Sequence, residues 1–584
     1  MPIRRATVGT KQSCLKLVAS LLLLLALPAA LQGAPAWHDA VDYTKLKTRL
    51  GAATPTGAGV PISLVEAPVV TVTGPPALTS YLADPSNPEF SAGSDPLGVA
   101  ATITDGSMVT HTGFSGHATG TVGSYFFGNT LSIAPGANSV VNYEASHWLA
   151  SILRVSGSAN PEPQPYRVQN FSWVSQYPGT GTQELSALRR LDYLVESSEM
   201  TAVVGANNYN VGNSTTWTHP TLFAHSYNAI VAGRSDGYHS RGQTSAFYGS
   251  GRYRPDLVAP ANTTSNATAQ ISSAATLLHQ SVTGTEGANS EVIKATLMAG
   301  ATKNEFLAWT DPTTGLANPW NRTHTRPLDD VMGAGELNIY NSYLIQLGGQ
   351  QAASVSAPTT AVGSYGWDYQ NRKNDSAVGD LFYNFEIAAG STAPELSIML
   401  AWNAKITDTN PSEANFSPLQ SLQNLDLQLY DSTAGFMGTM LDQSISAVDN
   451  VEHIYRTNLG PGTYTLKVSG AANWDYGLAW RMTTAFDQPT ADFDGDGAIS
   501  GGDFLVWQRN FGKLLGATNS EGDGDGDGDV DAEDLALWKA GAISPLTPPM
   551  LASIAAVPEP ATAGMLALTA TALLGARQFR SRRR

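Results

Sequence analysis

Short apolar runs and longer amphipathic segments alternate along the N-terminal part of the chain, from about residue 37 to 349. The apolar runs have the length of buried strands, whereas the amphipathic segments have the length of helices. Strands that alternate with helices are typical of a mostly parallel sheet covered by helices on both faces. The sequence therefore predicts an α/β unit, with strands at 61–65, 201–204 and 229–231 and helices at 184–199 and 271–280.

The pattern changes after residues 350–360, which are rich in Ala, Ser, Gln and Pro and have the composition of a linker. From there to about residue 486, apolar and polar residues alternate in short runs separated by turn residues. This alternation is typical of antiparallel strands with one buried face, so we expect a β-sandwich at 355–486. The expected strands lie at 381–387, 396–402, 425–430, 464–468 and 476–481.

Charge is concentrated near the C-terminal end. The 584 residues carry a net charge of −16, from 33 basic and 49 acidic residues, and this balance argues against a nucleic-acid partner. Between Asp492 and Asp534 there are 12 acidic and two basic residues, so this short stretch holds most of the negative charge. Such a cluster indicates cation binding rather than a generally acidic surface.

The acidic stretch contains a repeat with the spacing of a calcium loop. Oxygen-bearing residues stand at positions 1, 3, 5, 9 and 12 of each copy, and Gly497 or Gly528 stands at position 6, where the loop turns sharply. Each loop opens a helix that begins near position 12. An acidic disordered linker remains the alternative. The expected Ca²⁺ ligands are Asp492, Asp494, Asp496, Ser500 and Asp503 in the first copy and Asp523, Asp525, Asp527, Asp531 and Asp534 in the second.

The repeat resembles the dockerin family, because Asp rather than Glu stands at position 12 and only the loop and the following helix are repeated. The resemblance covers about 50 residues, at 489–542. It implies a small helical module with an EF-hand pair that folds on Ca²⁺ and binds a cohesin-like partner through its helices.

Both ends of the chain have the composition of targeting signals. A basic segment, an apolar run from 17 to 30 and small residues near 33–36 predict a cleaved signal peptide at 1–34, which also removes Cys14, the only cysteine. At 557–584 a Val-Pro-Glu-Pro motif, an apolar run and an arginine cluster resemble the PEP-CTERM sorting signal. This resemblance implies surface sorting by membrane machinery, with transient membrane association of the tail. An ordinary tail anchor is the alternative.

Four residues of the α/β unit have the order and the surroundings of nucleophilic machinery. Glu66 ends a buried strand, His117 follows a glycine-rich turn, Asn207 follows a second strand, and Ser265 opens an apolar helix. Sites in open α/β sheets lie where parallel strands end. The order acid, histidine, serine is one of the known orders of the catalytic triad.

The region from about residue 50 to 348 resembles the subtilase family of serine peptidases. The segment 254–260 and the residues around Ser265 match the family's serine motif, and His117 and Asn207 fall on its histidine and oxyanion asparagine. Residues 170–173, including Ser172 and Trp173, resemble the strand that lines the substrate cleft, and 333–338 resemble the closing motif. The resemblance implies an exported endopeptidase that needs no cofactor for catalysis, with the peptidase domain at 35–350.

Several departures from the family pattern leave a second interpretation open. Glu66 replaces the usual aspartate, Thr263 replaces the glycine that opens the serine motif, and Ala269 replaces its proline. The segment between Pro260 and Ser265 is also short. The alternative is therefore a catalytically silent scaffold that acts in surface adhesion or assembly. Other acids that could serve His117 are Asp84, Asp95 and Asp105, although none of them follows an apolar strand in the way that Glu66 does.

Overall fold

The computed structural model describes residues 35–542, apart from 74–77, 93–99, 156, 158, 176–180, 210–218, 220–221, 246–247, 373–374, 377–378 and 408–421. The predicted signal peptide (1–34) and sorting segment (557–584) lie outside the described residues. Within the described part of the chain, no helix combines the length and the apolar character needed to cross a bilayer.

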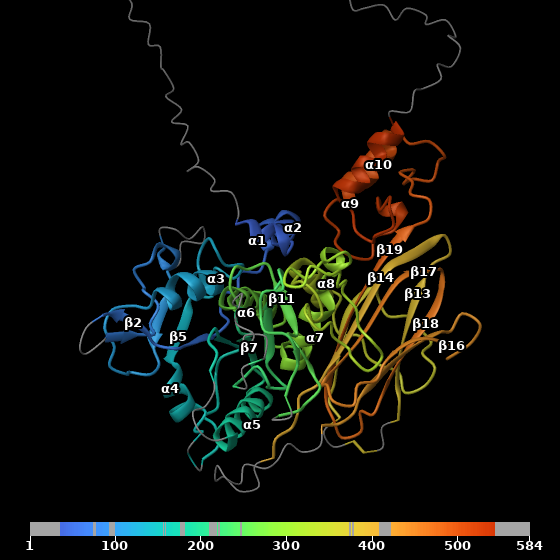
Figure 1. Ribbon diagram of the computed structural model, residues 1–584. Helices are drawn as coiled ribbons and strands as arrows, with labels where there is room; N and C mark the ends of the chain where they lie inside the picture. The colour runs from blue at the N-terminus through green and yellow to red at the C-terminus, as the bar shows by residue number, and fades with distance from the viewer. Residues whose placement is uncertain are drawn as a thin grey trace, which may run out of the picture.

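A seven-stranded sheet forms the centre of the N-terminal part of the chain (Figure 1). Every neighbouring pair of strands runs in parallel, which confirms the parallel sheet predicted from the alternation of strands and helices. All carboxyl ends of the strands therefore lie at one edge. In spatial order the strands are β11 (Leu257–Ala259), β8 (Ile230–Arg234), β7 (Thr201–Gly205), β6 (Val168–Phe171), β1 (Ile62–Glu66), β5 (Ser139–Glu144) and β4 (Thr102–Asp105).

Alternate side chains of these strands enter two separate cores, as the pleat of a strand requires. In β1, Ile62 and Leu64 belong to the core that contains α6, whereas Val65 belongs to the core that contains α5. Both faces of the sheet are thus covered, as expected. The helices are α1 (Ala36–Ala40), α2 (Tyr43–Leu50), α3 (Ser124–Phe127), α4 (Ala145–His147), α5 (Gly181–Ser198), α6 (Thr264–Ser281), α7 (Ser290–Gly300) and α8 (Ile339–Leu347), with a π-helix, η3 (His117–Gly123), before α3.

Two four-stranded antiparallel sheets follow, and their facing side chains share one core. The residues predicted as a linker are held by backbone hydrogen bonds, since Gln351 N–H donates to Trp367 and Ser354 exchanges bonds with Phe382. One sheet contains β12 (Tyr365–Gln370), β19 (Tyr476–Phe486), β14 (Ser391–Ala401) and β17 (Val451–Leu459), and the other contains β13 (Leu381–Ile387), β18 (Gly462–Ser469), β15 (Asp426–Asp431) and β16 (Thr439–Ser444). Two short antiparallel pairs join β2 (Val69–Val72) to β3 (Leu78–Ser80) and β9 (Gly242–Gln243) to β10 (Tyr253–Arg254).

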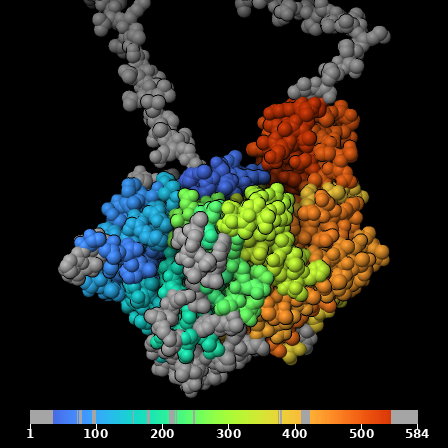
Figure 2. Space-filling view, viewed as in Figure 1, coloured from blue at the N-terminus to red at the C-terminus, as the bar shows by residue number. Residues whose placement is uncertain are grey.

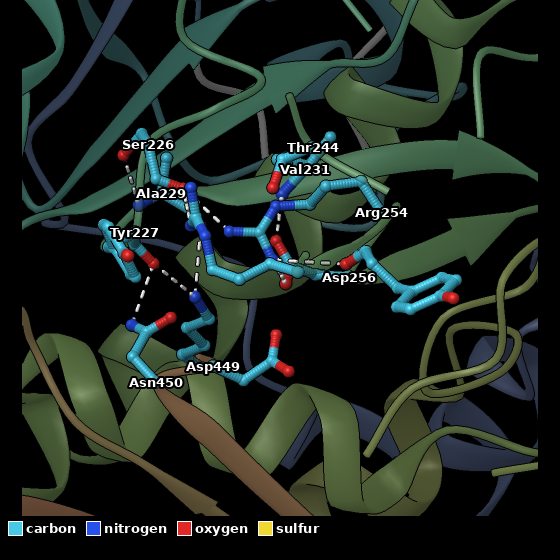
Figure 3. A network of polar contacts seen from close by, with 12 residues as sticks. Ser226, Tyr227, Ala229, Val231, Thr244, Arg254, Asp256, Asp449 and Asn450 are labelled. Carbon is cyan, nitrogen blue, oxygen red and sulfur yellow. Dashed lines mark hydrogen bonds and ion pairs between the residues drawn. The ribbon is translucent and has the colours of Figure 1, made fainter. Parts of the chain in front are cut away.

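A buried polar network joins the antiparallel sheets to the α/β unit (Figure 3). Lys294 Nζ on α7 and Asn450 Nδ2 next to β17 both donate to the carbonyl of Tyr227, each at 2.9 Å. Beside them Arg254 and Asp256 form a buried ion pair at 2.7 Å. Tyr227 precedes β8, and the ion pair precedes β11. The network therefore lies at the amino ends of the strands, away from the edge where sites of such sheets form.

The acidic segment contains two helices, α9 (Gly501–Asn510) and α10 (Ala532–Ala542), and contacts the rest of the protein through its second loop and through residues 513–515. Arg49 of α2 forms ion pairs with Asp529 and Asp531. In addition, Phe486 N–H of β19 donates to the carbonyl of Asp525 at 2.6 Å. Figure 2 shows these red residues next to the blue N-terminal helices. The segment is thus held against both the N-terminal helices and the antiparallel sheets.

Candidate active site

Glu66, His117 and Ser265, distant in sequence, form one hydrogen-bonded chain at the carboxyl edge of the parallel sheet. Glu66 is the last residue of β1, His117 the first of η3 and Ser265 the second of α6. His117 Nδ1 lies 2.6 Å from Glu66 Oε2, and His117 Nε2 lies 3.1 Å from Ser265 Oγ. Glu66 is fully buried, whereas the His117 side chain is 31% exposed. An acid, an imidazole and a hydroxyl in this arrangement can activate the hydroxyl as a nucleophile.

The other candidate acids do not contact His117 through any described hydrogen bond or ion pair. Asp105 accepts the Tyr81 hydroxyl at 2.7 Å, and Asp84 accepts backbone and hydroxyl groups of Ser86. Asp95 lies outside the described residues. Among the described acids, Glu66 is therefore the partner of the imidazole.

The start of α6 explains how Ser265 is presented. Thr263 caps the helix, because its side chain accepts the Asn266 N–H at 3.1 Å. The backbone of Thr263 is extended, with φ −139° and ψ 157°, so this turn does not require the glycine of the family motif. The Thr264 N–H donates to Asn208 Oδ1 at 2.8 Å. Ser265 N–H, in the first turn, has no acceptor within the helix.

Ser172 flanks the candidate nucleophile. Its carbonyl lies 3.1 Å from Ser265 Oγ, and its own hydroxyl lies 3.1 Å from the Ser265 carbonyl. The single hydroxyl proton of Ser265 can be donated to His117 or to Ser172, but not fully to both. Trp173, the other residue expected in the cleft, is half-buried and packs its ring against Phe223, with ring centroids 5.4 Å apart.

Asn207 follows β7, and its backbone is held on both sides by Ser240. Its N–H donates to Ser240 Oγ at 2.9 Å, and its carbonyl accepts the Ser240 N–H at 2.8 Å. Ser240 Oγ in turn lies 3.1 Å from His219 Nδ1, while His219 Nε2 lies 3.2 Å from the carbonyl of Gly242. A carbonyl only accepts, so Nε2 carries the proton and Nδ1 accepts from Ser240. Burial lowers the pKa of His219 to about 3, so the ring stays neutral.

Ser240 and His219 were not identified from the sequence. Neither belongs to a motif, and a single serine or histidine in a loop carries no signal until the fold brings it to Asn207. No hydrogen bond joins the side-chain amide of Asn207 to another described residue.

Glu66 and His117 shift one another's protonation. Burial raises the pKa of the Glu66 carboxyl, and the hydrogen bond and charge of His117 offset only part of that rise. Burial lowers the pKa of His117, but the hydrogen bond and negative charge of Glu66 outweigh it and raise the pKa above 6.5. The pair therefore holds the Nδ1 proton firmly, which leaves Nε2 free to accept once the ring is neutral.

The two acidic loops have matching local structure. In each copy the position-6 glycine N–H donates to the position-1 aspartate, at 2.9 Å for Gly497 and 3.0 Å for Gly528. The position-9 N–H donates to the position-12 aspartate at 2.7 Å in both copies. Both glycines have positive φ, 89° and 88°, which favours glycine at these positions. The sequence repeat is thus also a structural repeat.

Carboxylates gather in each loop closely enough to share a cation. Ligand atoms within 4.8 Å of one another come from Asp492, Asp494 and Asp503 in the first loop, and in the second from three overlapping sets: Asp523, Asp525 and Asp534; Asp525, Asp527 and Glu533; Asp529, Asp531 and Asp534. Asp496 lies outside the first set, and the Ser500 side chain caps α9 by accepting the Gly502 N–H. Burial together with neighbouring carboxylates raises the pKa of Asp523 to about 7. Asp529 and Glu533 were not predicted as ligands.

No family model matches the sequence, and no curated protein matches it either. Comparison with solved structures finds a serine protease of Aeromonas sobria (TM-score 0.30, 14% identity, covering 73% of this chain and 89% of that chain), also in complex with its chaperone ORF2 (0.30, 13%, 73% and 88%). Another is MycP1, a serine protease and an essential component of the type VII (ESX-1) secretion system (0.31, 14%, 53% and 88%). These likenesses are distant, and the interpretation of the site rests on its own geometry.

Proposed function

We propose that the protein is an exported serine endopeptidase that hydrolyses peptide bonds through an acyl-enzyme. The observation that carries this proposal is the hydrogen-bonded chain from Glu66 through His117 to Ser265. It joins the three groups in the order that general-base activation of a serine needs. His117 and Ser265 also carry the resemblance to the subtilase family in the sequence, whereas Glu66 stands where the family has aspartate.

In the proposed reaction the Ser265 hydroxyl attacks the carbonyl carbon of the peptide bond while His117 Nε2 takes its proton. The imidazolium then gives this proton to the leaving amine, and a water molecule activated in the same way releases the acyl group. Glu66 keeps the proton on Nδ1 and stabilises the charged ring. Because neutral His117 is the working base, its raised pKa sets the lower pH limit of activity.

Two donors are proposed for the oxyanion that forms during attack: the side-chain amide of Asn207 and the N–H of Ser265. Ser240 holds the Asn207 backbone, and the start of α6 leaves the Ser265 N–H without a helical acceptor. A donor of this kind contributes on the order of 10²–10³ in rate. The strand end at Ser172 and Trp173 is the proposed wall for the substrate peptide.

The acidic module is proposed to bind Ca²⁺ in both loops. The matching hydrogen bonds of the loops and their all-oxygen donor sets fit a hard divalent cation. Bound Ca²⁺ would neutralise carboxylates that otherwise repel one another, and it takes no part in peptide hydrolysis. A cohesin-like protein is the proposed partner of the module's helices, and no nucleic-acid partner is proposed.

Export and surface sorting rest on the two terminal segments of the sequence. The proposed signal peptide leads to a mature chain that begins near residues 31–37, and the proposed sorting segment brings the protein to membrane-bound sorting machinery. N-terminal sequencing of protein isolated from its native cell tests the first step. Recovery of Met1 contradicts it.

A second candidate function is the catalytically silent scaffold in surface adhesion or assembly. One contact favours it: the Ser265 hydroxyl lies as close to the Ser172 carbonyl as to His117 Nε2, both at 3.1 Å. A hydroxyl that donates to a carbonyl is not activated by the imidazole.

Turnover of an unfolded protein substrate separates the two functions. Wild type should generate new peptide N-termini, whereas Ser265→Ala should generate none above background. Equal inactivity of both proteins, with folding verified by circular dichroism, supports the scaffold instead.

A further inference from the structure

The proposed base and nucleophile stand on separate elements, η3 and α6, and a side chain next to the nucleophile adds a second hydrogen bond between these elements. Asn266, the residue after Ser265, donates from Nδ2 to the carbonyl of Thr121 at 2.6 Å. Thr121 lies four residues after His117 in η3. The bond therefore fixes the start of the nucleophile's helix against the helix that carries the base.

The amide of Asn266 is fixed at its other end by Thr263. The Thr263 hydroxyl donates to Asn266 Oδ1 at 2.9 Å, and its oxygen accepts the Asn266 N–H at 3.1 Å. A flipped amide would set Oδ1 against the Thr121 carbonyl, which can only accept, so the bond to Thr121 supports one orientation. Thr263 thus orients Asn266, and Asn266 reaches η3.

Packing does not hold Asn266 on its remaining side, because the residue lines a cavity of about 680 Å³. Trp37, Tyr125, Asn262 and Gln270 line the same cavity. The neighbouring residues of α6 are buried, and Ala267 shares a core with Ala118 and Val122 of η3, so the hydrogen bonds of Asn266 add to the packing between the two elements.

We infer that Thr263 and Asn266 are a positioning pair that sets the distance between Ser265 Oγ and His117 Nε2. The inference rests on the proposed peptidase function and adds two positioning residues to it. It also gives Thr263 a role. In place of the family glycine, Thr263 supports the contact between Asn266 and η3, so this departure does not by itself mean that the catalytic site is lost. Misplacement of reacting groups by about 1 Å can cost about 10²-fold in rate.

The test compares kcat and KM of Asn266→Ala with those of Gln270→Ala in the otherwise intact chain. Gln270 is the matched control, since it lies on the same helix, lines the same cavity and donates its amide to the carbonyl of Pro260, which is not part of η3. We expect Asn266→Ala to lower kcat by about 10- to 100-fold with KM within about twofold, and Gln270→Ala to stay within about twofold in both.

Thr263 variants test whether the Thr263 hydroxyl, which caps α6 and donates to Asn266, is needed for the rate. Thr263→Ser keeps the hydroxyl and should restore kcat to within about twofold of wild type, whereas Thr263→Ala should match Asn266→Ala. The double variant Thr263→Ala/Asn266→Ala should have the same kcat as either single variant, since each substitution removes the same contact between α6 and η3. The acid limb of the pH profile should not move, because Glu66 and His117 are untouched. Asn266→Ala with the kcat of Gln270→Ala overturns the inference.

Crystal structures of wild type and Asn266→Ala test the role of this contact without relying on activity. The inference expects the distance from Ser265 Oγ to His117 Nε2 to lengthen in the variant, and an unchanged distance overturns it. If wild type has the described Ser265–His117 distance but no peptidase activity, the proposed function is contradicted. The comparison of this distance between wild type and Asn266→Ala still decides whether Asn266 is a positioning residue.

Discussion

Replacing Glu66 by glutamine removes the negative charge behind His117 and keeps the size of the side chain. The carboxylate lies 2.6 Å from Nδ1 and is fully buried, so no solvent takes its place. Without the charge the imidazolium of the transition state loses its partner, and the amide can also favour the wrong tautomer of the ring. Loss of this acid in serine peptidases costs about 10⁴ in turnover, which corresponds to about 5 kcal/mol of transition-state stabilisation.

The same substitution should move the pH profile in a defined direction. Glu66 raises the pKa of His117, and activity needs the neutral ring, so wild-type kcat/KM should fall as the pH drops through a value above 6.5. In Glu66→Gln the hydrogen bond to a charged group is gone while burial still lowers the pKa of His117. The acid limb should therefore shift to lower pH even as the maximal rate falls.

The assay measures kcat/KM of a quenched peptide substrate between pH 5 and 9 for wild type, Glu66→Gln and Glu144→Gln. Glu144 is the matched control, because it faces Glu66 in the register of β1 and β5, is also buried, and accepts the His147 N–H rather than a bond from His117. Glu144→Gln should keep the wild-type rate and acid limb to within a few-fold. Full activity of Glu66→Gln with an unmoved acid limb would refute the reasoning.

Four further predictions concern the oxyanion region, Ca²⁺ binding by the acidic module, the contact of that module with Arg49, and Asp449 in the buried polar network of Figure 3. Ser240→Ala removes the acceptor of the Asn207 N–H and should lower kcat by about tenfold with little change in KM or in the acid limb, measured on the same substrate. Ca²⁺ at 100 times its dissociation constant should stabilise the protein by about 2.7 kcal/mol per site, measured by thermal unfolding. Arg49→Ala removes two ion pairs to the second loop and should make the segment after β19 more sensitive to limited proteolysis at the same Ca²⁺ concentration. Burial raises the pKa of Asp449 from 3.8 to about 6, so the folded protein binds this proton more tightly than the unfolded chain and the residue costs stability above pH 6. Asp449→Asn should therefore raise the free energy of unfolding by about 3 kcal/mol at pH 8 and by little at pH 4, measured in urea.

Each of these predictions has an outcome that contradicts it. A Ser240→Ala enzyme with wild-type kcat means that Asn207 is held by other contacts. If the melting temperature is the same with Ca²⁺ and with a chelator, the alternative of an acidic linker explains the segment better than a calcium-binding module. Arg154→Ala, which breaks an ion pair with the exposed Glu162, is the control for Arg49 and should leave proteolysis unchanged. Equal gains in stability at pH 8 and pH 4 would show that Asp449 does not act through its charge.

The sequence predicted those parts of the molecule that follow from local patterns. The alternation of apolar and polar residues predicted both ends of β13, and the apolar run before Glu66 predicted β1 to within one residue. Both predictions succeeded because the buried positions of these strands are apolar. Within the β-sandwich, β12, β16 and β17 were missed, because polar residues interrupt their apolar positions and weaken the alternation. The segment 350–360 was expected to be a linker because its composition is polar, and only the fold reveals its bonds to β12 and β13.

For the candidate site, the order of the motifs identified Glu66, His117 and Ser265, but it did not identify the residues that position the site. Ser240 and His219 belong to no motif, and Asn266 stands next to Ser265 without matching the family's serine motif. Ser240 and Asn266 contact backbone groups of distant residues, and His219 contacts the Ser240 hydroxyl. The sequence also could not tell that Trp173 packs against Phe223 or that Arg49 reaches the second acidic loop, since both contacts join segments far apart in the chain.

The central claim is that Glu66 and His117 make Ser265 a nucleophile. Intact-mass spectrometry after treatment with a serine-directed fluorophosphonate tests it most directly, with the adduct located by peptide mapping. Folded wild type should gain one adduct on Ser265, His117→Ala should react far more slowly, and Ser265→Ala should not react at all. Folded wild type that gains no adduct, or gains it on another serine, would contradict the account.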